Sequence, residues 1–263
     1  MRTPFPLFLA AAVLACPPAP AGSIGSAVTL ELCTDQAGPL PLYPVSAPGG
    51  ARKAYAEAVR GAGYRIRVHN TLGCRVGLVI AVDGRNIISG GQSWLDSGER
   101  MYILSPGETQ EFTGWRTAQD KVNRFYFTTV EDSYAAAFGD TSAMGVVAMA
   151  VYPEKPTPPP PPSPPPGIRR FRCEDSTGAA AAPEMSRQSR KFEGKSAPGT
   201  GYGEEVYSPS FTVEFDPETV AREKCLIKYE WRETLLRTGI LRGPSVPRNR
   251  LWDGGYCPPP PRS

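Results

Sequence analysis

The chain has 263 residues, of which 40% are hydrophobic and 21% charged, values that lie near the average for globular proteins. Its 29 basic and 26 acidic side chains leave a net charge of +3, which is too small for a protein that binds nucleic acid through the phosphates. The 30 prolines and 27 glycines exceed average usage. We therefore expect a folded chain with many turns and no nucleic-acid partner.

The first residues have the features of an export signal. An apolar run from Phe5 to Ala15 is too short to span a bilayer and is typical of a secretory leader. Ala19-Pro20-Ala21 fits a cleavage site that would make residues 1–21 a signal peptide, whereas Val13-Leu14-Ala15-Cys16 resembles a lipobox that would make Cys16 a lipid-modified terminus. Both alternatives predict an exported protein that is periplasmic, at the cell surface or secreted, with membrane contact only through a lipid anchor on Cys16.

Five cysteines follow the leader, and none has the C-x-x-C spacing of a zinc or redox site. Export permits disulfides, so we expect Cys33 to pair with Cys74, on one side of a proline run. A second bond is expected between two of the three cysteines beyond that run, namely Cys173, Cys225 and Cys257.

The proline run divides the chain into predicted regions. Residues 156–166 contain nine prolines and predict a stiff polyproline spacer of roughly 34 Å, placed at 156–167. Before it we expect a flexible N-terminal region over residues 22–50, with one short strand at 28–32, and a β-sandwich-like domain over 51–155. After it we expect a small cysteine-containing segment over 168–263, either β-rich or α+β.

Alternating apolar residues are the main evidence for strands. Tyr64, Ile66 and Val68 alternate with polar residues and are expected to form a hairpin with the segment around Tyr55. Residues 76–82 form an apolar run that ends in Asp83-Gly84, a dipeptide that favours a tight turn into a return strand over 85–89. Further strands are expected at 101–104, 111–112, 124–128 and 145–152, which indicates an antiparallel sandwich.

The segment beyond the spacer shows weaker patterns. A polar, glycine-rich loop is expected over 174–204. Phe211, Val213 and Phe215 alternate with polar residues, as do the apolar residues of 225–231, so two strands are expected there. A short helix over 232–237 should end at Gly239.

Catalytic and cofactor motifs are weak. His69 is the single histidine and shares a strand face with two arginines, which suits neither a general base nor a metal ligand. Gly194-Lys195-Ser196 lacks the first glycine of a phosphate-binding loop, and the 199–203 glycines lack the strand and helix of a dinucleotide site. Glu131, Asp132 and Asp140 could bind Ca²⁺, but their spacing favours a solvated acidic loop. We expect no cofactor and no resident metal.

Aromatic residues in loops are candidates for partner contact. Trp94 lies in a glycine- and serine-rich stretch and Tyr134 in the acidic loop, where an exposed ring offers a large contact area. Packing over the end of the sandwich is the alternative for both. Trp115 and Trp231 are expected in the core.

Parts of the sequence resemble a domain that recurs in uncharacterised bacterial secreted proteins and lipoproteins. The resemblance covers about 90 residues and is carried by 64–68, 79–86, 114–116, 125–128, 133–135 and 145–147. It implies an envelope location and a β-sandwich-like module, and it brings no catalytic residues with it.

Together these features predict a non-enzymatic envelope protein that binds a protein or glycan, or takes part in an assembly. The alternative is an extracytoplasmic hydrolase that uses two carboxylates, as glycosidases do.

Overall fold

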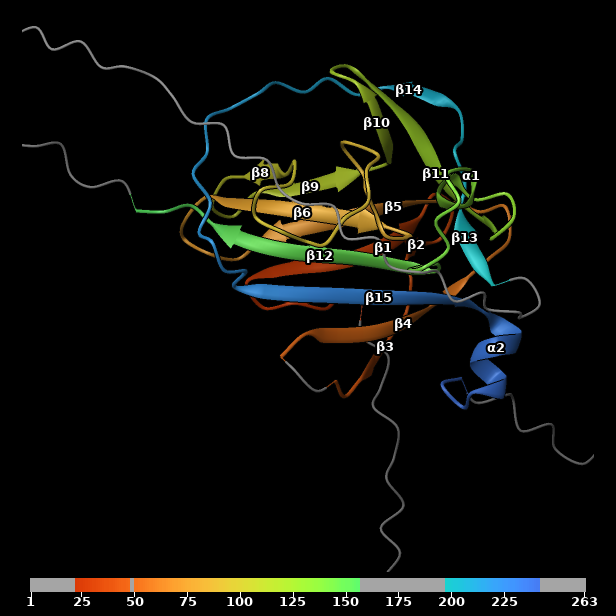
Figure 1. Ribbon diagram of the computed structural model, residues 1–263. Helices are drawn as coiled ribbons and strands as arrows, with labels where there is room; N and C mark the ends of the chain where they lie inside the picture. The colour runs from red at the N-terminus through yellow and green to blue at the C-terminus, as the bar shows by residue number, and fades with distance from the viewer. Residues whose placement is uncertain (1–21, 48–49, 157–196, 242–263) are drawn as a thin grey trace, which may run out of the picture.

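The computed structural model describes residues 22–47, 50–156 and 197–241. The protein is mainly β, with two sheets that form a β-sandwich-like fold (Figure 1). The expectations for the leader, Cys16, Cys173, Cys257 and the proline spacer lie outside the described residues, except for Pro156. No helix in the described ranges has the length and apolar character needed to cross a membrane.

The first sheet has the strand order β10-β11-β5-β1-β2, with β9 paired to β5 and with β13 and β14 paired to β11. Its strands are β1 (Val28–Thr34), β2 (Gly38–Pro39), β5 (Gly63–Asn70), β9 (Thr109–Phe112), β10 (Gly114–Ala118), β11 (Lys121–Thr129), β13 (Pro198–Thr200) and β14 (Glu205–Tyr207). Every pairing in this sheet is antiparallel.

The second sheet has the order β3-β4-β15-β12-β6-β7, with β8 paired to β6. Its strands are β3 (Leu42–Val45), β4 (Arg52–Ala58), β6 (Val76–Val82), β7 (Arg85–Asn86), β8 (Tyr102–Leu104), β12 (Val146–Pro153) and β15 (Glu223–Trp231). The β4–β15 pair is parallel, and the other pairs are antiparallel. The two helices of the described chain are short: α1 (Tyr134–Ala137) and α2 (Arg232–Arg237).

Alternating side chains from both sheets meet in one core. On β5, Tyr64, Ile66 and Val68 are buried, and on β15 the buried residues include Ile227 and Tyr229. All of these belong to a single buried cluster that spans the two sheets. Because side chains on a strand alternate between its faces, this arrangement places the intervening polar residues outside, as the sequence pattern predicts.

Two local predictions are confirmed by backbone geometry. Asp83 and Gly84 both have positive φ, 50° and 79°, and join β6 to β7 in a tight turn. Helix α2 ends at Arg237 and is capped by Thr238, and the next residue, Gly239, has a φ of 75°, the left-handed conformation that favours glycine after a helix. The expected return strand is shorter than predicted, since β7 covers only Arg85–Asn86.

The predicted hairpin between β4 and β5 is wrong. β4 pairs with β3 and β15 in the second sheet, whereas β5 pairs with β1, β9 and β11 in the first. The buried face of β4 carries Ala54, Ala56 and Ala58 in place of the larger Tyr55 and Glu57. The glycine-containing turn at 60–63 therefore crosses from one sheet to the other.

The division at the proline run also needs correction. β15, from beyond that run, lies in the second sheet between β4 and β12, and β13 and β14 pair with β11. The segment after the run thus completes the same sandwich and is not a separate unit. Residues 22–50 likewise contain β1, β2 and β3, because their apolar residues, such as Leu30 and Leu42, are fully buried in the core.

Candidate aromatic binding pocket

A short helix presents two aromatic residues at one end of the sandwich. The Ser133 hydroxyl accepts a hydrogen bond from Ala136 N at 3.2 Å and so caps the N-terminus of α1. Tyr134 begins this helix, and Phe138 follows its last residue, about one turn later. The acidic loop of the sequence therefore holds a capped helical turn that fixes the positions of both rings.

Tyr134 lies at the centre of an aromatic cluster that runs from the core to the surface. Its ring centroid is 4.4 Å from that of Trp115, 5.0 Å from Phe138 and 5.5 Å from Tyr202, which stacks nearly parallel to it. Trp115 is buried and donates from Nε1 to the Gly201 carbonyl at 3.1 Å. Phe138 and Tyr202 are 59% and 45% exposed, so the cluster ends in aromatic surface that solvent can reach.

Two glycines leave room for aromatic rings at this end, Gly90 for Tyr134 and Gly201 for Tyr126, another ring of the pocket lining. A Cβ atom on Gly90 would lie 2.7 Å from the Tyr134 hydroxyl, and the φ of Gly90 is +69°. A Cβ atom on Gly201 would lie 2.1 Å from Cζ of Tyr126. Both glycines are therefore required for the rings to approach the backbone this closely.

The rings border a pocket of about 570 Å³, within the range usual for small-ligand sites. Its polar lining includes the exposed Asp132 carboxylate and the hydroxyls of Ser89 and Thr117. The Arg85 guanidinium lies 4.3 Å above the centre of the Phe138 ring and donates to the Gly90 carbonyl. The arrangement offers flat apolar surface with hydrogen-bonding groups around it.

A buried polar network holds the chain segments that carry the pocket. The Asp83 carboxylate accepts hydrogen bonds from Gly145 N at 2.8 Å, Thr200 N at 2.6 Å and the Tyr229 hydroxyl at 2.6 Å. Burial raises the pKa of Asp83 to about 6, although the three hydrogen bonds oppose that shift. The carboxylate thereby fixes Thr200, the last residue of β13, against the turn that follows β6. Thr200 lies two residues before Tyr202, so the same contact helps to place that ring.

Hydroxyl groups extend this network into the core. The Thr200 hydroxyl lies 2.7 Å from both the Tyr229 and Tyr64 hydroxyls. Since an ionised carboxylate only accepts, Tyr229 donates to Asp83, Thr200 to Tyr229 and Tyr64 to Thr200. Burial raises the pKa of both tyrosines well above the ordinary value, so they remain protonated donors.

Trp94 and Tyr134, the two aromatics singled out in the sequence, occupy different settings. Tyr134 borders the pocket and is partly buried, whereas Trp94 is 67% exposed and does not belong to the pocket lining. Backbone N–H groups of Trp94 and Asp96 donate to the Glu99 carboxylate, which holds this loop in shape. The ring of Trp94 makes none of the aromatic contacts that join Tyr134 to Trp115, Phe138 and Tyr202.

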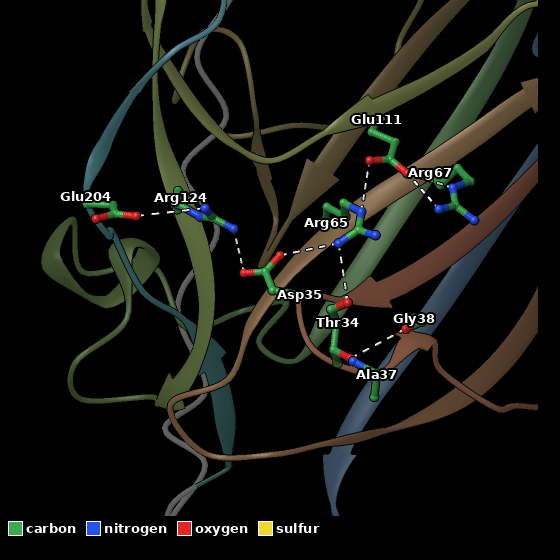
Figure 2. Close-up of polar contacts among 9 residues, drawn as sticks. All are labelled: Thr34, Asp35, Ala37, Gly38, Arg65, Arg67, Glu111, Arg124 and Glu204. Carbon is green, nitrogen blue, oxygen red and sulfur yellow. Dashed lines mark hydrogen bonds and ion pairs between the residues drawn. The ribbon is translucent and has the colours of Figure 1, made fainter.

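The polar face around His69 is an ion-pair network on the outside of the first sheet (Figure 2). Arg65 Nε lies 2.9 Å from Glu111, which also pairs with Arg67 at 2.8 Å, and Asp35 bridges Arg65 and Arg124 at 3.4 and 2.5 Å. Burial would raise the pKa of Glu111, but hydrogen bonds from Arg67 and Arg65 outweigh it and lower that pKa. His69 Nδ1 contacts Thr109 Oγ1 at 2.9 Å, outside this network. Arg65 and Arg67 share the Glu111 carboxylate, and Arg65 and Arg124 share the Asp35 carboxylate. These shared ion pairs support a structural role for this face.

The structure does not join Cys33 to Cys74: both thiols are free, as is that of Cys225. In the β1–β5 ladder Cys33 faces Arg65, whereas Val28, at the other end of β1, faces Asn70, close in sequence to Cys74. Five residues of strand separate the two ends by roughly 17 Å, and a disulfide needs Cα atoms within about 7 Å. Burial raises the pKa of the Cys33 thiol and raises that of Cys225 to about 12.

The acidic residues do not converge as a metal site. Asp140 accepts from Ser142 N and Oγ, and Asp132 lies near Thr129 Oγ1 at 3.4 Å. Within the described part of the chain, no three His, Cys, Asp or Glu side chains are grouped so that they could hold a metal ion.

Sequence reasoning missed Tyr202 and Phe138 as members of the pocket. Tyr202 stands between glycines in the 199–203 stretch, which the sequence pattern assigns to a glycine-rich loop without a dinucleotide site. That spacing could have indicated a ring close to the backbone, but the contact of Tyr202 with Tyr134 depends on the β11–β13 pairing, which joins segments far apart in the chain.

No protein-family model, curated protein or solved structure matches the chain.

Proposed function

We propose that the protein is an exported, non-enzymatic module that binds a saccharide through the aromatic pocket. The observation that carries the proposal is the pair of exposed rings, Phe138 and Tyr202, beside the polar groups of the 570 Å³ pocket. A pyranose ring has an apolar C–H face and a rim of hydroxyl groups. The aromatic faces complement the first, and Asp132, Ser89 and Thr117 can bond to the second.

The support for export is the leader-like run from Phe5 to Ala15, which precedes the described residues. A saccharide ligand agrees with that location, because envelope and extracellular spaces are rich in glycans. A lipid on Cys16 would add membrane anchoring without changing the pocket.

The pocket composition favours binding over hydrolysis. Asp132 is the one carboxylate among the residues that line it, whereas glycoside hydrolysis ordinarily uses two, roughly 5 to 10 Å apart. A single exposed carboxylate beside aromatic rings suits hydrogen bonding to sugar hydroxyls. Incubation with the oligosaccharides named below, followed by an assay for new reducing ends, separates the two functions.

The direct test is calorimetric titration of the purified protein with soluble N-acetylglucosamine and glucose oligosaccharides. Tyr202→Ser should weaken binding about thirtyfold, the effect of losing an aromatic anchor worth about 2 kcal/mol. Tyr207→Ser is the matched control, because Tyr207 is 73% exposed and lies outside the pocket. Equal affinities for the two variants, or no heat of binding with any of these saccharides, would contradict the proposal.

A further inference from the structure

A second hollow lies beside β8, β9 and β10, and Arg116 and Thr117 are the residues that it shares with the lining of the aromatic pocket. It has a volume of about 890 Å³ and is bordered by β8, β9, β10 and residues 208–217, which we call the strap. In Figure 1 the strap is the blue loop that leaves β14 and passes outside β8 and β9 before β15 begins. We call the hollow beneath it the strap groove.

One wall of the strap groove is an unpaired strand edge. β9 forms a ladder with β5 alone, and β8 with β6 alone, among the residues that the structure describes. Beyond the β5 ladder, the backbone of Gln110, Glu111 and Phe112 makes no further hydrogen bond there. A free edge of this kind presents N–H and C=O groups that an added strand can satisfy.

The opposite wall is a segment that has the sequence of a strand but forms none. Phe211, Val213 and Phe215 alternate with Thr212 and Glu214, and a strand was expected here. The structure shows hydrogen bonds only near the two ends of the strap, at Ser208 and Ser210 and at Glu214 and Asp216. Between them Phe211 is 83% and Val213 41% exposed. The physical reason for the missing strand is that none of the strands in the described ranges pairs with it.

Two aromatic side chains form the floor. Tyr102 of β8 stacks on Phe112 of β9 with ring centroids 4.2 Å apart, so the floor joins the two sheets. The Arg116 guanidinium holds the floor to the strap: it donates to the Tyr102 hydroxyl at 2.8 Å and to the Ser208 carbonyl at 2.9 Å. The apolar floor lies between the unpaired edge of β9 and the strap. This arrangement suits an added strand whose alternate side chains are apolar.

The charged side chains that line the strap groove differ in whether they have partners. Glu111 is matched by Arg65 and Arg67, while Glu99 and Glu108 accept backbone N–H groups. Arg100 is exposed and has no acidic partner within the described ranges. Of the charged side chains that line the groove, Glu99, Glu108 and Arg116 are held by hydrogen bonds and Glu111 by ion pairs, which leaves Arg100 as the charged side chain available to a carboxylate of the ligand.

We propose that the strap groove binds an extended peptide segment of another protein, which adds as a strand to the free edge of β9 beneath the strap and places an acidic side chain against Arg100. Its backbone would satisfy both β9 and residues 211–213, and its apolar side chains would lie on the Tyr102–Phe112 floor. Arg116 and Thr117 border both this site and the saccharide pocket, but the edge of β9, the strap and Arg100 belong to this site alone, so neither proposal depends on the other.

The test uses a short fluorescein-labelled peptide that alternates valine and threonine around a central aspartate, with fluorescence anisotropy as the readout. Two twin peptides serve as probes, one N-methylated at alternate residues and one with lysine in place of aspartate. We expect micromolar binding of the first peptide, at least tenfold weaker binding of the N-methylated twin, and several-fold weaker binding of the lysine twin. Arg100→Ala should remove the preference for aspartate, and Arg237→Ala, an exposed arginine on α2, should leave it unchanged.

Hydrogen exchange locates the bound peptide. Amide exchange should slow at residues 109–113 and 211–214 when the first peptide is present, because new backbone hydrogen bonds form there. Absence of binding by that peptide, equal binding of its N-methylated twin, or protection at the edges of β3 or β14 instead would each overturn the proposal.

Discussion

Replacing Asp83 with Asn tests the buried network that fixes β13. Asn keeps the size of the side chain but has one acceptor oxygen where Asp has two. Because Oδ1 accepts two hydrogen bonds and Oδ2 one, the amide oxygen should take the place of Oδ1. The amide NH₂ then faces Thr200 N–H, which is left without an acceptor.

The size of the effect follows from two opposing terms. A buried N–H without an acceptor costs about 1 to 3 kcal/mol, and the two remaining bonds weaken because they lose a charged acceptor. Against this, the ionised Asp83 is itself costly to bury: its pKa of about 6, compared with 3.8, corresponds to about 3 kcal/mol at neutral pH. We therefore expect Asp83→Asn to lower the free energy of unfolding only modestly, by about 1 to 2 kcal/mol, at pH 7.5.

The change of folding stability with pH tests whether the pKa of Asp83 is raised. The folded-state pKa of Asp83 lies above its unfolded value, so protonation favours the folded state, and the wild type gains stability from this group as pH falls from about 7 toward 4. The linkage relation gives a gain of about 1.4 kcal/mol between pH 7.5 and pH 5. Asn cannot titrate, so the stability difference between wild type and variant should grow by that amount at pH 5.

Urea unfolding of both proteins at pH 7.5 and pH 5 measures this difference, and contributions from other titrating groups cancel in the comparison. Tyr64→Phe is a suitable control: it removes the hydroxyl at the far end of the network, leaves the carboxylate in place, and should cost about 1 kcal/mol with little dependence on pH. A stability difference for Asp83→Asn that stays constant or shrinks toward pH 5 would refute the assignment of a raised pKa.

Two further pairs of substitutions test the sandwich and its aromatic residues. Gly114→Ala should destabilise the protein by more than about 2 kcal/mol, since its Cβ would lie 2.0 Å from the Asn123 carbonyl oxygen, while Gly73→Ala, with open space around it, should stay within about 0.5 kcal/mol in the same urea titration. Trp94→Ala should leave the melting temperature nearly unchanged because the side chain is exposed, whereas Tyr134→Ala should cost about 3 kcal/mol through three lost ring contacts. Equal melting temperatures for the two aromatic variants would contradict the assignment of Tyr134 to the cluster.

Local strand signals in the sequence were sufficient to predict much of the fold. The alternation in β5, the turn at Asp83-Gly84, and the strand and helix after residue 222 were all predicted correctly, because each depends on neighbouring residues. The pairing of strands was not predictable in the same way. β4 and β5 follow each other in the chain, yet they lie in different sheets. The buried face of β4 carries the small Ala54 and Ala56, and the larger Tyr55 on its other face made the wrong face look apolar in the sequence.

The candidate site was predicted only in part for the same reason. Tyr134 was identified as an aromatic in an acidic loop, but its role depends on Trp115 beneath it and Tyr202 above it. Trp115 was assigned to the core, which is correct, although it also supports the pocket floor. The pairing of cysteines rests only on their side of the proline run, and the strand register that sets Cys33 opposite Arg65 and Val28 opposite Asn70, four residues before Cys74, does not enter that rule.

The position of β15 has a consequence for how the chain folds. This strand is the neighbour of both β4 and β12, and the hydrogen bonds between Arg232 and Glu57 join residues 175 positions apart. Contacts between such distant segments close long loops before they contribute stability, and proteins rich in them fold slowly. Until residues 223–231 have been synthesised, β4 and β12 present bare edges to one another, and a growing chain in that condition is open to wrong strand pairing. A chain that is slow to fold also stays extended for longer, which is the condition in which a polypeptide can still be passed through a narrow channel.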